Sequence, residues 1–308
     1  MRIFYGSSHP KLGIAISEYL GVQAGGMYTS KFSCGEIYAR VKETIRGHDC
    51  YIIQTIGHNP NDDYMELFLM MDALKRSSAN SINVIMPYFG YARQDKKSAP
   101  REPISARMIA DLLQAVRLDR LITIDLHSDQ IQGFFNVPVD HLTSLPLFVE
   151  YFKNKNLKNL TVVAPDTGRA KFAKKLSDKL NGELVIMHKT RPDHNVAEIV
   201  NVVGDVKDRT VLLVDDMIDT GGSVTSGLKR LRELGCNEDI YLAATHAVFS
   251  GSAFQKLNES DFAEIVVTDS IPQVNNQLSN LVVLSTARLL GEVIKRNHEN
   301  KSINDLMD

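Results

Sequence analysis

Short apolar runs alternate with helical repeats along the first half of the chain. Strand-like runs lie at residues 2–5, 50–54, 82–86 and 121–124. Between them, apolar residues recur at helical spacing after position 12, after position 65 and after position 109. Strands that alternate with helices predict an α/β fold, with a mainly parallel sheet covered by helices on both faces. Residues 31–41 alternate apolar and polar positions instead, which predicts a strand or a hairpin.

The second half repeats this rhythm. Strands are predicted at residues 160–164, 183–187, 211–214, 241–247, 264–268 and 281–284, with helices after positions 172 and 224 and over 287–294. Residues 188–195, HKTRPDHN, have no period and are predicted to form a polar loop. A chain of 308 residues is long for one core, so two domains are expected, and the turn residues near 141–146 suggest the boundary.

Composition narrows the class of protein. The chain is 44% hydrophobic and 23% charged, as in ordinary globular proteins, and its net charge of -2 gives no reason to expect nucleic acid or an anionic membrane as a partner. Its three cysteines lie far apart without a CxxC pair, which argues against a disulfide framework or a zinc site. No signal peptide and no membrane-spanning apolar run is evident, so a cytoplasmic location is expected.

The segment 211–234 has the most specific local pattern. A predicted buried strand is followed by Asp215 and Asp216, then by a loop rich in glycine and hydroxyl residues, and then by leucines at helical spacing. Backbone N–H groups at such a helix start bind anions, and phosphate is the natural ligand. Two carboxylates beside a phosphate suit sugar hydroxyls or a metal ion, so the pattern predicts a ribose 5-phosphate site. The alternative is a strand end followed by an ordinary turn.

The segment VLLVDDMIDTGGS resembles the phosphoribosyl-diphosphate loop of type I phosphoribosyltransferases and ribose-phosphate diphosphokinases. The resemblance implies that Asp215 and Asp216 hold the ribose hydroxyls. It also implies that the 5-phosphate is cradled by the loop residues, which are Asp219, Thr220, Gly221, Gly222 and Ser223. The loop alone does not separate the two families.

Two further motifs favour the diphosphokinases. YFGYARQDKK, at 88–97, combines aromatic side chains, an arginine and two lysines, which suit a purine base and a polyphosphate, although such clusters are often only solvated loops. It resembles the family's ATP-binding stretch, which implies that Arg93 and Gln94 bind ATP. DLHSDQIQGFF, at 125–135, resembles a diphosphokinase signature, which implies that His127 lies at the magnesium-nucleotide site.

Three charged residues complete the expected chemistry. Asp166 follows a predicted strand and offers a hard oxygen ligand for Mg²⁺, the alternative being an N-cap for the next helix. Its loop is shorter than the family's common form. Lys189 and Arg191 resemble the cations of the family's catalytic flexible loop, which implies that they offset charge on the transferring group, although exposed basic residues are ordinarily only solubilising.

The segment KFSCGE, at 31–36, resembles the family's short adenine-binding hairpin, with Phe32 and Glu36 matching. Cys34, a weak hydrogen-bonding group, stands where Asp or Asn is usual, which predicts an altered nucleotide selectivity. Family members give this hairpin to a neighbouring subunit, which implies a dimer-based homo-oligomer, up to a hexamer. Pro100 replaces a serine of the family's regulatory phosphate site, although Thr44 and Arg46 resemble another part of it.

The resemblance covers residues 6–290 and implies two similar domains of type I phosphoribosyltransferase-like fold, each a mainly parallel sheet flanked by helices. These would span residues 1–143 and 144–308, with the closing segment 286–308 packing back on the first domain. The implied reaction moves the diphosphoryl group of MgATP to the C1 hydroxyl of ribose 5-phosphate, giving 5-phosphoribosyl 1-diphosphate and AMP. The alternatives are a phosphoribosyltransferase and a catalytically silent homologue that regulates an active diphosphokinase.

Overall fold

The computed structural model describes residues 1–193, 196–273 and 278–306, with side chains outside 189–201. The chain forms two compact units. The first consists of Met1–Thr143, Ser270–Pro272 and Ser285–Asp308, and the second of Ser144–Asp269 and Gln273–Leu284. Within the described residues, no helix is long and apolar enough to cross a membrane.

The first unit is built on a five-stranded parallel sheet in the order β1-β4-β5-β6-β7. The strands are β1 (Arg2–Tyr5), β4 (Asp49–Ile53), β5 (Ser81–Ile85), β6 (Arg120–Ile124) and β7 (Val139–Leu142). The central strands are almost entirely buried, because both faces of the sheet are covered by helices. This is why the sequence shows them as short, mainly apolar runs.

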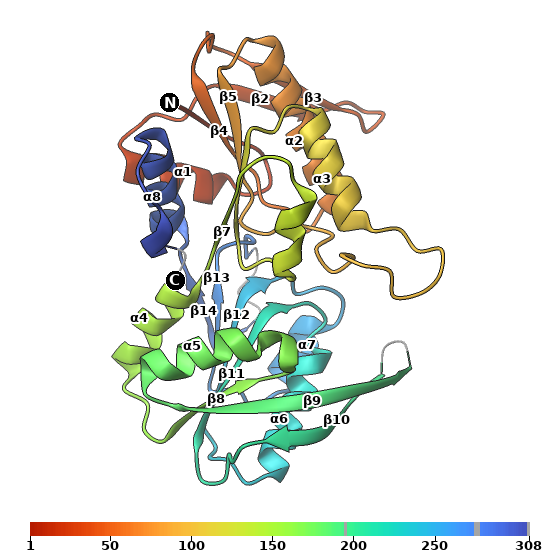
Figure 1. Cartoon of the computed structure of the whole chain (residues 1–308), viewed down its shortest axis with the longest axis vertical. Helices are drawn as coiled ribbons and strands as arrows, with labels where there is room; N and C mark the ends of the chain where they lie inside the picture. The colour runs from red at the N-terminus through yellow and green to blue at the C-terminus, as the bar shows by residue number, and fades with distance from the viewer. Residues whose placement is uncertain (194–195, 274–277, 307–308) are drawn as a thin grey trace. The chain divides into compact units, whose positions relative to one another are not determined.

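Helices cover both faces of this sheet (Figure 1). α2 (Pro60–Arg76) and α3 (Ser105–Ala115) share an apolar cluster with one face of the strands. On the other face, α1 (Pro10–Leu20) packs with α8 (Ala287–His298), the last helix of the chain. The closing helix is thus part of the core of the first unit.

Polar contacts also hold α8 in place within the first unit. The Asp140 carboxylate of β7 accepts hydrogen bonds from Arg120 Nη1 and Asn297 Nδ2, each at 2.7 Å. Tyr19 of α1 donates its hydroxyl to Glu292 of α8 at 2.9 Å. The far end of the chain is therefore tied to both β7 and α1.

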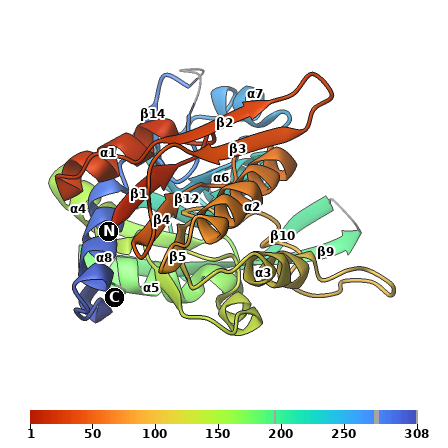
Figure 2. The same ribbon diagram turned by 90° about the horizontal axis from the view of Figure 1, so that it is seen from above.

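Residues 31–41 were predicted to form a strand or a hairpin, and the structure shows an antiparallel hairpin that includes them. β2 (Met27–Lys31) pairs with β3 (Ile37–Val41), and Lys31 lies opposite Ile37. Figure 2 shows the hairpin beside α2, against which the apolar residues of β3 pack. Its tip, residues 32–36, extends into solvent.

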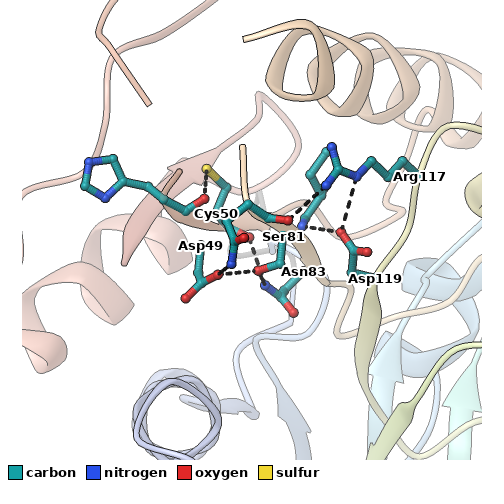
Figure 3. A network of polar contacts seen from close by, with 9 residues as sticks. Asp49, Cys50, Ser81, Asn83, Arg117 and Asp119 are labelled. Atoms are coloured by element: carbon teal, nitrogen blue, oxygen red, sulfur yellow. Dashed lines mark hydrogen bonds and ion pairs between the residues drawn. The ribbon is translucent and has the colours of Figure 1, made fainter. Parts of the chain in front are cut away.

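A network of polar side chains aligns the amino ends of β4, β5 and β6 (Figure 3). Asp49 accepts hydrogen bonds from Asn80 Nδ2 at 2.7 Å and from Ser81 Oγ at 2.8 Å, and Asp119 accepts one from the Ile82 amide at 2.7 Å. The hydrogen bond from Asn80 is the largest cause that lowers the pKa of Asp49. These side chains hold the strands together. Ligands of α/β sheets bind at the opposite edge of the sheet, where the strands have their carboxyl ends.

The second unit contains a seven-stranded sheet in the order β10-β9-β8-β11-β12-β13-β14, parallel except for β9 with β10. The strands are β8 (Leu160–Ala164), β9 (Glu183–Asp193), β10 (Val196–Val203), β11 (Thr210–Ile218), β12 (Ile240–Ala247), β13 (Glu264–Thr268) and β14 (Leu281–Leu284).

Helices cover both faces of this second sheet as well. α4 (Leu145–Lys155) and α5 (Ala170–Leu180) pack on one face. α6 (Gly222–Glu233) and α7 (Ala253–Asn258) pack on the other. The described part of the chain also contains short 3-10 helices at η1 (Asp129–Phe134), η2 (Thr167–Arg169) and η3 (Asn304–Leu306).

Two sequence predictions were wrong in this unit. Residues 188–193, expected in a loop, continue β9, which pairs antiparallel with β10. A strand of this kind needs no apolar run, because an antiparallel edge ribbon can face water. Asp215 and Asp216 lie within β11 and not after it, since β11 stays paired with β12 as far as Ile218.

Candidate functional site

The turn from β11 into α6 forms an anion-binding loop. Gly221 is the N-cap of α6, with φ 76° and ψ -10° in the left-handed region that glycine favours. The first bond of the helix runs from the Thr225 amide to the Gly221 carbonyl at 3.1 Å. The amides of residues 222–224 therefore have no partner within the helix, and they lie at its positive end. A phosphate is the ligand that this geometry suits best.

The neighbouring turn after β12 holds the loop in shape. Ser250 donates its backbone amide to the Asp219 carbonyl at 3.0 Å and its hydroxyl to the Asp219 carboxylate. Phe249, with φ 47°, donates its amide to the Ile218 carbonyl at 3.0 Å. Asp219 thus has a bracing contact in the loop. Thr220 and Ser223 are exposed, so their hydroxyls are accessible to a ligand.

The two carboxylates before this loop differ in exposure. Asp216 is 8% exposed and Asp215 is half-buried. Asp215 accepts the backbone amide of Asp216 at 2.9 Å. Both acids lie in the same unit as the phosphate loop and only a few residues before it, as the predicted sugar-phosphate site requires.

Lys256 is a residue that the sequence reasoning missed. It lies on α7, and its Nζ is 3.7 Å from the position that a Cβ would occupy at Gly222, the first residue of α6. The Lys256 side chain is half-buried, and within the described part of the chain no acidic side chain forms an ion pair with it. Only the tertiary packing of α7 on α6 brings this ammonium to the loop, so the sequence carried no local signal for it.

The predicted nucleotide residues lie in the first unit. Phe32 and Glu36 flank the tip of the hairpin, where the Phe32 amide donates to the Glu36 carbonyl at 2.8 Å. Phe32 is 54% exposed and meets Tyr38 edge to face. Cys34, at the same tip, is also exposed. An exposed ring beside a carboxylate can stack on a base and read its edge.

Arg93 and Gln94 are exposed in the segment between β5 and α3. The Gln94 side chain has a fixed partner, because its Oε1 accepts a hydrogen bond from Ser105 Oγ at 2.6 Å. Its backbone carbonyl accepts one from the Ala106 amide at 3.2 Å. Gln94 is therefore anchored at both ends to the start of α3.

His127 is exposed just beyond the carboxyl end of β6. The chain turns sharply before it, since Asp125 has a φ of 39°, a conformation that is unusual outside glycine. The next amide, that of Leu126, donates to Nε2 of His141 at 2.8 Å. The strained turn and this hydrogen bond set the path of the chain into His127.

Asp166 caps a short helix in the second unit. Its Oδ1 accepts the Arg169 amide at 3.2 Å, so the capping role weighed from the sequence is present. A carboxylate with one such contact retains lone pairs for a metal ion. The side chains of Lys189 and Arg191 lie outside the described residues, and only their backbone, in β9, is defined.

The candidate ligands, Asp166 and His127, fit magnesium better than a metal whose ligands all come from the protein. Among the described residues, no group of three or more His, Cys, Asp or Glu side chains could hold a metal ion. Mg²⁺ commonly takes one or two protein ligands and completes its shell with water and substrate phosphates. Asp166 and His127, which lie in different units, fit that pattern as single ligands.

Family models and a solved structure show which family of proteins this chain resembles. Residues 1–116 match the family model described as the N-terminal domain of ribose phosphate pyrophosphokinase, and residues 193–308 match the phosphoribosyl synthetase-associated domain. A crystal structure of phosphoribosylpyrophosphate synthetase from Mycobacterium smegmatis superimposes with a TM-score of 0.91 at 42% identity, covering 97% of this chain and 99% of that one. The fold is that of the phosphoribosylpyrophosphate synthetases.

Curated relatives named ribose-phosphate pyrophosphokinase match over the full length. The protein from Wolinella succinogenes is 47% identical, with 99% of this chain and 98% of the relative covered. That from Oceanobacillus iheyensis is 44% identical, with 100% and 97% covered. The chain belongs to the ribose-phosphate pyrophosphokinase family and is an enzyme of phosphoribosyl pyrophosphate synthesis. The family resemblance and the α/β class predicted from the sequence are confirmed.

Proposed function

We propose that this enzyme transfers the β,γ-diphosphoryl group of MgATP to the C1 hydroxyl of ribose 5-phosphate, giving 5-phosphoribosyl 1-diphosphate and AMP. The phosphate loop at the start of α6, in a chain that matches the family over its full length, carries this proposal. In the reaction, the C1 oxygen forms a bond to the β-phosphorus. The bond between the β-phosphorus and the oxygen bridging to the α-phosphate breaks, and that oxygen leaves with AMP. The hydroxyl proton passes to solvent.

The sugar phosphate is assigned to the second unit. Residues 219–223 and the amides at the start of α6 bind the 5-phosphate, while Asp215 and Asp216 hold the ribose hydroxyls. Lys256 adds a positive charge beside the first residue of the helix. A helix end, a braced loop and a nearby ammonium all favour a dianionic ligand.

The nucleotide is assigned to Phe32, Glu36, Arg93 and Gln94 of the first unit. The exposure of Phe32 supports stacking on the base, and the fixed position of Gln94 supports a specific polar contact. His127 and Asp166 each serve as ligands for magnesium ions that accompany the phosphates. When bound, magnesium offsets phosphate charge and orients the transferring group.

Lys189 and Arg191 are assigned to the transferring diphosphoryl group. Phosphoryl transfer needs little covalent participation from the protein, so positioning and charge neutralisation supply most of the rate enhancement. Two cations at the transferring group would act mainly in the transition state. Their family resemblance supports this assignment.

We also propose that the enzyme is a dimer-based homo-oligomer. Tyr28, Phe32 and Tyr38 expose aromatic surface on one hairpin, and such patches often mark protein interfaces. The hexamer and the cytoplasmic location expected from the sequence remain predictions. Light scattering coupled to size-exclusion chromatography would give the oligomer number.

Turnover by the purified chain tests the proposal. ³¹P NMR should show AMP and a diphosphate esterified to C1 when ATP, ribose 5-phosphate and Mg²⁺ are all present, with neither product when the sugar phosphate is omitted. Binding of ATP without sugar-dependent turnover would favour the silent regulatory homologue, for which Cys34 and Pro100 are the motivating departures. A phosphoribosyltransferase would instead consume 5-phosphoribosyl 1-diphosphate when given a base.

A further inference from the structure

The carboxamide of Gln94 is held from the protein side by a buried hydroxyl. Ser105, the first residue of α3, is 5% exposed, whereas Gln94 is exposed. Three hydrogen bonds fix Gln94: the Gln94 amide donates to Tyr91 O at 3.0 Å, the Ala106 amide donates to Gln94 O at 3.2 Å, and Ser105 Oγ donates to Oε1 at 2.6 Å. Both the backbone and the side chain of this residue are therefore anchored.

The contact with Ser105 also determines which end of the carboxamide is available. A separation of 2.6 Å lies in the range of an O–H···O bond and is shorter than the range of N–H···O bonds, so the oxygen faces Ser105. A carboxamide has one acceptor oxygen and one amino group with two donors. Because the oxygen faces Ser105, the amino group on the other side of the carboxamide carbon faces away from Ser105 and is the part left for a ligand.

We propose that Ser105 is a positioning residue for nucleotide binding. It orients Gln94 so that the amino group donates to an acceptor atom of ATP, a phosphate oxygen or a ring nitrogen. The proposal rests on the assignment of Gln94 to the ATP site. It adds that the contact has a fixed polarity, and that a buried serine without any ligand contact of its own sets it.

The physical basis is preorganisation. A free glutamine side chain samples several rotamers, and ordering it on binding costs affinity. With Ser105 in place, the entropy of ordering the Gln94 side chain is lost during folding and not during binding, because the hydroxyl already holds the side chain in the absence of ATP. Removal of the hydroxyl leaves the amino group mobile and also lets the carboxamide rotate its oxygen toward the ligand.

Steady-state kinetics of Ser105→Ala and Gln94→Ala, singly and together, test this coupling. Ser105→Ala should raise KM for ATP about three- to tenfold, the range expected for one side chain that loses its fixed position, with kcat and KM for ribose 5-phosphate unchanged. Ser105→Thr keeps the hydroxyl and should restore KM for ATP. In the Gln94→Ala background, Ser105→Ala should cause no further change, since the serine acts only through the glutamine.

Gln94→Glu tests the polarity without altering Ser105. The carboxylate can still accept the Ser105 hydroxyl but offers no donor, so KM for ATP should rise at least as much as in Gln94→Ala. An unchanged KM for ATP in a folded Ser105→Ala enzyme would overturn the positioning role, and so would an equal Ser105→Ala effect in both backgrounds. If Gln94→Ala leaves KM for ATP unchanged while turnover persists, the ATP assignment of Gln94 fails as well, although the overall reaction stands.

Discussion

Asp63 is a buried carboxylate that should destabilise the native enzyme at neutral pH. It is 7% exposed at the start of α2, and its Oδ2 accepts the Gly57 amide at 2.7 Å. Burial is the main cause that raises its pKa to about 6 from 3.8, and the nearby Glu66 carboxylate adds to the shift. Because its pKa is higher in the folded state, the folded protein holds more protons than the unfolded chain between about pH 4 and pH 6.

The contribution of Asp63 to stability therefore falls as the pH rises through that interval and then stays level. The rise in the pKa of Asp63 from 3.8 to about 6 corresponds to about 3 kcal/mol, an upper figure for the cost of ionising Asp63 at pH 8. Asp63→Asn has no charge to bury, and its carbonyl can still accept the Gly57 amide. The variant should be more stable than the wild type by about 1–3 kcal/mol at pH 8, with little gain at pH 4.

Urea unfolding at pH 4 and pH 8 measures this difference directly. Asp62→Asn is the matched control, because Asp62 is exposed and pairs with Lys31 at 2.7 Å. Such a surface pair contributes about 1 kcal/mol or less, so the control should be no more stable than the wild type at either pH. An equal gain for Asp63→Asn at both pH values, or a loss at pH 8, would refute the reasoning.

Three further changes probe the assigned residues. Lys256→Met should raise KM for ribose 5-phosphate several-fold in low salt and leave KM for ATP unchanged, whereas Lys229→Met, on the exposed face of α6, should change neither constant. Gly221→Ala places a Cβ at φ 76°, a strain of about 1–2 kcal/mol, and should weaken sugar-phosphate binding about tenfold. Gly21→Ala, at φ 65° in open space, should lower only the melting temperature. Lys189→Ala should lower kcat far more than it raises KM for ATP, and an unchanged kcat would remove Lys189 from its assigned role.

Apolar periodicity predicted the strands and helices whose burial is complete. β5 and β6 are mainly apolar because helices cover both faces of their sheet, and sequence alone predicted them to within a residue. Apolar periodicity failed where hydrogen-bonded strand pairing, and not burial, decides the structure. The end of β9 is polar yet extended, because it pairs with β10. α4 was not predicted, although Leu145, Phe148 and Phe152 follow helical spacing.

The site shows the same division. The glycine and hydroxyl residues of the phosphate loop are adjacent in sequence, so their pattern was visible before the structure. Lys256 and Ser105 act through tertiary packing, one across two helices and one across a loop, and neither belongs to a local motif. Residues of this kind become evident only when the distances are known.

Transfer from ribose 5-phosphate carrying ¹⁸O at the C1 hydroxyl tests the central claim most directly. Attack of the C1 oxygen on the β-phosphorus of ATP keeps the label in the bridge between C1 and the new diphosphate. ³¹P NMR should then show an isotope shift on the phosphorus attached to C1, with unlabelled AMP as the second product. Release of free diphosphate, with the label still on an unmodified sugar phosphate, would show that water and not the sugar accepts the group, and would contradict the proposed reaction.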